Sequence, residues 1–180
     1  MYYLKQPRII LNLAIMSYMW ACCSFTYYMI AFYLKYLPGN IYNNNLASTV
    51  SEFLAILLSG YLYKRLGLRL SFTFLLTISV FGGLMILFIG VDSTFWMPFF
   101  VLFAKFGISG GFNLCYCSTV FVFPTLFCAT AIGICNFFGR LITIWAPLVA
   151  EKDWPLPMVL FTSFAALGII VIQFVKPITD

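Results

Sequence analysis

Six stretches of this chain are long enough and apolar enough to cross a lipid bilayer as helices. Such a helix needs about 20 predominantly apolar residues. The 180 residues are 63% hydrophobic and only 8% charged, and the mean hydropathy is +1.02. A water-soluble globule of this length could not bury so much apolar surface. We therefore expect an all-α integral membrane protein in which residues 1–180 form a single domain, with helices at about 11–34, 46–63, 70–90, 96–120, 128–149 and 157–175.

The connectors between these segments distribute the basic residues unevenly. Six crossings put both termini on the same side of the membrane. If that side is the inner one, the outer connectors carry two basic residues, Lys35 and Lys152, and the inner segments carry six, which are Lys5, Arg8, Lys64, Arg65, Arg69 and Lys176. Inner loops of membrane proteins are enriched in Lys and Arg, so we expect both termini inside. This bias fits a plasma membrane or an organelle membrane equally well.

The chain lacks the residues that several classes of function require. The chain has no histidine, which excludes haem or quinone ligation by histidine. Cys115 and Cys117 are two residues apart and point to different helix faces, so they do not form a metal site. The six cysteines fall in or beside apolar segments, where reduced thiols are expected. We find no phosphate-binding loop, no catalytic carboxylate pair and no dense basic patch, and we expect no enzyme, cofactor, metal or nucleic-acid partner.

Three ionisable residues fall inside the predicted spans: Glu52, Lys105 and Arg140. From the helix rise of 1.5 Å per residue, Lys105 and Arg140 lie roughly 13 Å below the outer boundary and Glu52 about 9 Å below it. A charge at that depth costs about 2.5–3.5 kcal/mol, so each should face the bundle interior or a wet cavity. One interpretation is a substrate site for a small organic ion, with Arg140 as a bidentate anion donor and the other two as countercharges. The alternative is an ion-pair network that holds helices together, or snorkelling of Glu52 and Lys105 toward the membrane surface. Arg140 would then be neutralised by Glu52 or by a partner chain.

Glycines near Lys105 indicate close helix packing. Gly107 and Gly111 are four residues apart and therefore share one helix face. Small residues at this spacing let two membrane helices approach closely. We expect a packing role for both, although a flexible, broken helix beside a substrate path is also open.

The connector at 63–69 resembles a known loop motif. With its preceding glycine it reads Gly60-Tyr-Leu-Tyr-Lys64-Arg65-Leu-Gly67-Leu-Arg69. This is similar to the cytoplasmic loop motif of the major facilitator superfamily, a glycine-led turn with an acidic residue, a basic residue and then G-R-R/K. The resemblance implies a role in conformational change for Gly60, Arg65, Gly67 and Arg69.

Two longer stretches resemble one branch of that superfamily, the organic cation, organic anion and carnitine transporters. TYYMIAFYLKYLPGNIYNNNLASTVSEF (26–53) is similar to the seventh and eighth helices of this family, with its tyrosine-rich helix, G-N-I-Y loop and later V-E. FVFPTLFCATAIGICNFFGRLITIWAPL (121–148) is similar to a later stretch, in which Pro124, Thr125, Gly133, Arg140 and Pro147 fall in register. The resemblance implies the last six helices of a twelve-helix fold. It also places Arg140 beside the substrate path, which favours anionic or zwitterionic substrates, and it implies helix-packing roles for Pro124, Gly133 and Pro147.

Some positions depart from the family pattern. Lys64, Phe121 and Cys128 stand where the family has charges that hold its inner face closed. The sequence is therefore compatible with two different functions. The first is a half or truncated secondary transporter, completed by a second six-helix half from a homodimer or a separate chain. The second is a non-transporting structural subunit of a larger membrane complex. A truncated piece of a longer product is a third possibility.

Overall fold

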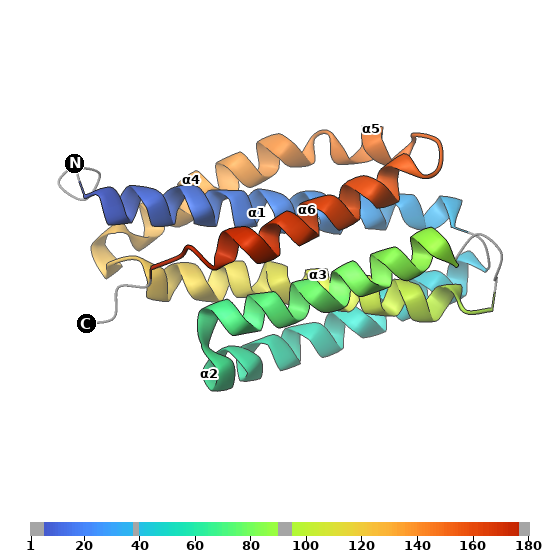
Figure 1. Ribbon diagram of the computed structural model, residues 1–180, viewed down its shortest axis with the longest axis horizontal. Coiled ribbons are helices and arrows are strands. Elements are labelled where there is room, and N and C mark those ends of the chain that lie inside the picture. The colour runs from blue at the N-terminus through green and yellow to red at the C-terminus, as the bar shows by residue number, and fades with distance from the viewer. Residues whose placement is uncertain (1–5, 38–39, 90–94, 177–180) are drawn as a thin grey trace.

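The computed structural model describes residues 6–37, 40–89 and 95–176, and every regular element in these ranges is a helix (Figure 1). The expectation of an all-α protein is confirmed. Most of the predicted connector 91–95 and the last residues, 177–180, lie outside the described ranges. The elements are α1 (Pro7–Tyr33), the 3-10 turn η2 (Leu34–Tyr36), α2 (Ile41–Phe88), α3 (Met97–Val122), α4 (Thr125–Thr143), α5 (Ala146–Ala150) and α6 (Leu156–Ile172).

Local sequence signals set several of the helix starts. A proline lies in the first two positions of α1, α3, α5 and α6, where the missing N–H has no helical partner to lose. Asn40 precedes α2, and its side-chain oxygen accepts a hydrogen bond from the Tyr42 amide at 2.9 Å. Pro124 precedes α4, and its carbonyl accepts from the amides of Phe127 and Cys128. The corner at Pro124 therefore ends α3 and starts α4.

The 48-residue α2 is broken at Gly67, where the ribbon turns back on itself (Figure 1). Gly67 has φ 76° and ψ 178°, a conformation essentially restricted to glycine. The arms 41–66 and 68–88 therefore take the places of the predicted segments 46–63 and 70–90, and the break falls inside the predicted connector 63–69. The sequence motif supplied the glycine that this reversal requires.

Gly67→Ala is expected to lower the thermal unfolding midpoint of the purified protein in detergent. A side chain at this φ and ψ costs about 1–3 kcal/mol, although a Cβ there meets no atom within 4 Å. Gly60→Ala is the matched control, because Gly60 lies in the same helix with open space around it and no positive φ. Equal midpoints for the two variants would contradict a conformational requirement at Gly67.

The prediction of one continuous helix over 128–149 is wrong. The structure divides it into α4 and the short α5, with Ile144 and Trp145 between them. Pro147 explains the break, because a proline ring clashes with the carbonyl four residues earlier, here that of Thr143, the last residue of α4. Pro147 thus interrupts the helix rather than packing inside a continuous one.

The distribution of side chains is that of a membrane protein. The buried face of the first arm of α2 carries small and polar residues, and large apolar side chains cover much of the outside of the molecule. By length and apolar composition, four helical segments of the described chain could cross a membrane: Pro7–Tyr36, Ile41–Phe88, Met97–Val122 and Thr125–Ala150. The 17-residue α6 is apolar but shorter. The chain is a multi-pass integral membrane protein.

The two ends of the described chain meet at one end of the bundle (Figure 1). The Asn12 side chain donates to the Lys176 carbonyl at 2.7 Å and accepts from the Lys176 amide at 3.0 Å. Arg69, predicted as a gating residue, donates through Nε to the Val175 carbonyl at 3.0 Å and also through Nη2. Side chains from α1 and α2 therefore hold the backbone that follows α6.

Candidate functional site

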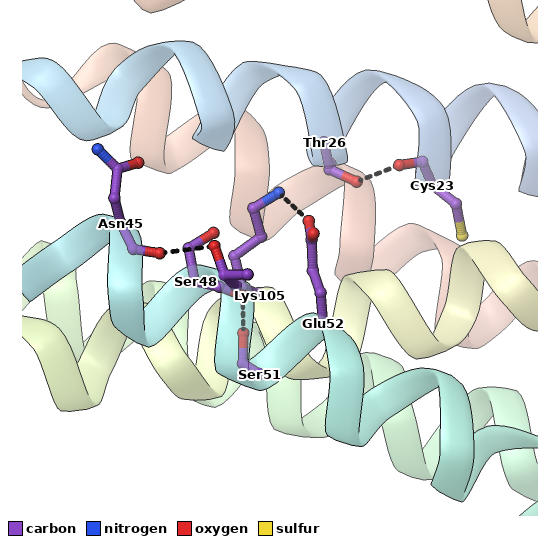
Figure 2. A network of polar contacts seen from close by, with 8 residues as sticks. Cys23, Thr26, Asn45, Ser48, Ser51, Glu52 and Lys105 are labelled. Carbon is purple, nitrogen blue, oxygen red and sulfur yellow. Dashed lines mark hydrogen bonds and ion pairs between the residues drawn. The ribbon is translucent and has the colours of Figure 1, made fainter. Parts of the chain in front are cut away.

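Glu52 and Lys105, predicted to be close in depth, form an ion pair. Glu52 lies on the first arm of α2 and Lys105 on α3, and Lys105 Nζ is 2.9 Å from Glu52 Oε1 (Figure 2). The Lys105 side chain is 2% exposed and the Glu52 side chain 28% exposed. An isolated charge on either residue would be costly inside a membrane protein, and the pair lowers that cost.

Tyr27 of α1 completes the environment of Lys105. Lys105 Nζ lies 3.6 Å from the centroid of the Tyr27 ring, which is within the range of a cation–π interaction. The ammonium is therefore held by a carboxylate on one side and an aromatic face on the other. This arrangement joins α1, α2 and α3 at one point.

A cavity of about 210 Å³ opens beside Glu52. Its wall combines the carboxylate with aromatic rings and small polar groups, namely Tyr27, Tyr28, Glu52, Ile56, Ser109, Phe112, Asn113 and Tyr116. Lys105 is absent from this wall among the described residues. Of the two residues of the ion pair, only Glu52 therefore lines the cavity.

Ser109 is the unusual group in this wall. Its residue is 5% exposed, and its Oγ has no hydrogen-bond partner among the described residues. Asn113, one turn further along α3, donates from Nδ2 to Ser59 Oγ at 2.7 Å. A buried hydroxyl without a partner is costly, so a molecule that enters the cavity and bonds to Ser109 would recover that cost.

Arg140 lies on α4 and points to α1 rather than to Glu52. Its Nη1 donates to the Tyr28 hydroxyl at 3.0 Å, and its guanidinium carbon lies 5.6 Å from the Tyr28 ring centroid. Arg140 is exposed, and it has no acidic partner within ion-pair distance in the described part of the chain. The expectation that Glu52 neutralises Arg140 is wrong, because Glu52 is already paired with Lys105.

A second, larger cavity lies against Arg140. It has a volume of about 540 Å³ and is bounded by α1 and by the segment from α4 to α5, with Tyr28, Phe32, Phe137, Arg140, Leu141, Thr143, Ile144 and Pro147 in its wall. Tyr28 lines this cavity and also the smaller one beside Glu52. Tyr28 therefore lies in the wall of both cavities and is bonded to the Arg140 guanidinium.

The other predicted site residues lie elsewhere. Gly60 and Arg65 are exposed near the turn of α2, and the guanidinium of Arg65 lies 5.6 Å from the Tyr61 ring centroid. Gly111 is packed less tightly, because a Cβ there would lie 3.4 Å from Cys23 Sγ. A Cβ at Gly133 meets nothing within 4 Å, so packing there would need an atom outside the described residues.

Sequence reasoning did not identify Tyr27, Tyr28, Ser109 or Asn113 as site residues. The tyrosines stood in a stretch noted only for its likeness to a tyrosine-rich helix. Nothing in the sequence distinguishes Ser109 from the other serines of the spans. Its position four residues after Lys105, on the same face of α3, is the one signal that could have found it.

Comparison with known proteins gives a consistent result. Solute carrier family 22 member 15 of Xenopus tropicalis is 30% identical over 158 residues, which cover 82% of this chain and 30% of that protein. Solute carrier family 22 member 4 of Mus musculus is 30% identical over 179 residues, covering 95% of this chain and 32% of that protein. Organic anion transporter 3 of Mus musculus is 28% identical over 160 residues, covering 85% and 29%. No family model matches the chain.

These similarities confirm the resemblance to organic cation, organic anion and carnitine transporters. They cover most of this chain, whereas the chain spans about three-tenths of the length of each relative. The relatives are transporters rather than enzymes, which agrees with the expectation that this protein is not an enzyme. The chain is therefore homologous to part of the organic anion and cation transporters of solute carrier family 22.

Proposed function

We propose that this chain forms the last six helices of a major facilitator transporter and takes part in moving a small organic anion or zwitterion across a membrane. The observation that carries the proposal is Arg140, a charge without an acidic partner in the described chain, exposed in a cavity of about 540 Å³. The homology to organic ion transporters supports it.

The chemistry of Arg140 suits an anionic substrate. A guanidinium remains charged at every physiological pH and can donate two parallel hydrogen bonds to a carboxylate. The Tyr28 hydroxyl accepts from Nη1 and so fixes one edge of the guanidinium, which leaves the other donors for a ligand. Apolar and aromatic side chains in the cavity wall would contact the organic body of the substrate.

A second six-helix half is part of the proposal. The chain spans about three-tenths of its relatives' length, and transporters of this fold bind substrate between two halves. That half would come from a second copy, from a separate chain or from a longer product. We further propose that both termini face the inner side and that the turn at Gly60, Arg65, Gly67 and Arg69 takes part in the conformational change.

Reconstitution of the natively purified protein tests the proposal. Proteoliposomes that contain the protein with every chain that copurifies should accumulate 3-phenylpropionate, a small organic anion, faster than empty liposomes. The mass of the native complex in mild detergent identifies the second half. A complex with stoichiometric partners and no uptake of organic ions would instead favour the structural-subunit function.

A further inference from the structure

We infer that Lys105 is the residue that sets the charge selectivity of this site: it cancels the charge of Glu52 and so makes the smaller cavity a subsite for an uncharged hydrogen-bonding group instead of an ammonium group. The inference rests on the proposed function, because it assumes that the same substrate reaches Arg140. It narrows the substrate class to organic anions that carry a hydroxyl or amide group at the end remote from the carboxylate.

The position of Lys105 is the first step. The Lys105 side chain is 2% exposed, and its ammonium is bonded to Glu52 and faces the Tyr27 ring. Lys105 forms no part of the cavity wall among the described residues. Lys105 therefore cannot reach a ligand in the cavity without leaving both partners. It acts through Glu52, as a positioning residue.

The second step is the character of the cavity. The Glu52 side chain is 28% exposed and lines the cavity, where an uncompensated carboxylate among aromatic rings would attract an organic cation. With Lys105 only 2.9 Å from Oε1, an ammonium entering the cavity meets a charge that is already compensated. An uncharged donor does not need a net negative charge to bond to Glu52, and the buried, unpartnered Ser109 hydroxyl in the cavity wall would gain a partner if its side chain turned toward such a group.

The third step is the link between the two cavities. Tyr28 borders both, so one elongated molecule could place its carboxylate at Arg140 and its other end beside Ser109. Arg140 is then the uncompensated charge of the combined site, because Glu52 and Lys105 cancel. Such a site favours an anion over a molecule that carries an additional positive charge.

A matched pair of probes tests this inference. 3-[4-(Hydroxymethyl)phenyl]propionate and 3-[4-(aminomethyl)phenyl]propionate differ only in a hydroxyl against an ammonium at the end remote from the carboxylate. Equilibrium dialysis against the natively purified complex gives the affinity for each. We expect the wild-type protein to bind the hydroxymethyl probe at least about tenfold more tightly, because a second positive charge is not compensated at this site.

Two variants separate charge from folding. Lys105→Gln leaves Glu52 uncompensated, and we expect it to reverse the preference toward the aminomethyl probe, a change of about tenfold or more in the affinity ratio. The Glu52→Gln/Lys105→Gln double variant has no charge at the pair, and we expect the wild-type order to return. This double variant also remains informative if Lys105→Gln alone does not fold.

The outcomes distinguish the inference from the proposed function. Binding of both probes with an unchanged ratio in Lys105→Gln overturns the role of Lys105 and leaves organic anion binding intact. A wild-type preference for the aminomethyl probe overturns it as well, as does a double variant that prefers that probe. If the wild-type protein binds neither probe, nor 3-phenylpropionate, the proposed function fails.

Discussion

Replacing Arg140 by alanine is expected to reduce the uptake of 3-phenylpropionate by roughly ten- to hundredfold while the protein remains folded. Arg140 is the free cation of the larger cavity, and hydrogen bonds to charged groups contribute about 1.5–3 kcal/mol. Its own partner in the structure is the neutral Tyr28 hydroxyl, so its removal leaves no buried charge unpaired. The effect should therefore appear in substrate binding rather than in stability.

The controls for Arg140 are chosen by charge and by geometry. Lys152→Ala removes one positive charge from an exposed residue outside both cavities and should leave uptake near the wild-type rate. Arg140→Lys keeps the charge but loses the two-pronged donor, so uptake should be intermediate. Initial rates in proteoliposomes, with size-exclusion profiles to verify folding, measure all three. Wild-type uptake by Arg140→Ala would remove this residue from the site.

Of the variants proposed for this protein, Gly107→Ala is expected to lower the thermal unfolding midpoint the most. A Cβ there would lie 2.2 Å from the Leu75 carbonyl oxygen and 2.5 Å from the Ser79 nitrogen, both backbone atoms of α2. Backbone atoms cannot move aside as a flexible side chain can, so α2 and α3 would have to separate. Overpacking of this kind costs about 1–3 kcal/mol and sometimes more, and α2 with α3 forms the most extensive helix contact of the described chain.

Gly133→Ala is the matched control for Gly107→Ala. Both are glycines in helices, but a Cβ at Gly133 meets nothing within 4 Å. Alanine has the higher helix propensity, so Gly133→Ala should be neutral or slightly stabilising in the absence of a second half. Thermal unfolding in detergent measures the difference. A normal midpoint for Gly107→Ala would show that the α2–α3 packing is looser than the structure describes.

The sequence identifies some of the glycines at which α2 and α3 pack closely, but not all of them. The spacing of Gly107 and Gly111 predicts close approach on one face of α3, and in the structure Gly107 lies so near the backbone of α2 that a Cβ there would clash with it. Gly82, on the partner helix, was not identified, although a Cβ there would lie 2.3 Å from the Ala104 nitrogen. Spacing within one helix indicates a small-residue face, but it does not identify the residues of the neighbouring helix that use it.

The sequence predicted which charged residues belong to the candidate site, but it did not predict which of them interact. The cost of charge in a membrane identified Glu52, Lys105 and Arg140, and the structure joins the first two and leaves the third with Tyr28. The partner of each charge is set by how helices are rotated about their axes. In a soluble helix the apolar stripe fixes that rotation. In these membrane helices large apolar side chains lie on the outside of the molecule as well as in the core, so an apolar stripe does not fix the rotation.

The sequence by itself determined the class of the protein, the approximate helical segments, the connector 63–69 that contains Gly67, and the relation to organic ion transporters. These follow from apolar length, from a backbone conformation that needs glycine, and from motif spacing that resembles the family. The tertiary structure alone decided which charge is free and which is cancelled, because Glu52 and Lys105 are 53 residues apart and meet only through the packing of α2 on α3. That decision makes Arg140 the candidate anion site and Lys105 a residue that acts through its partner.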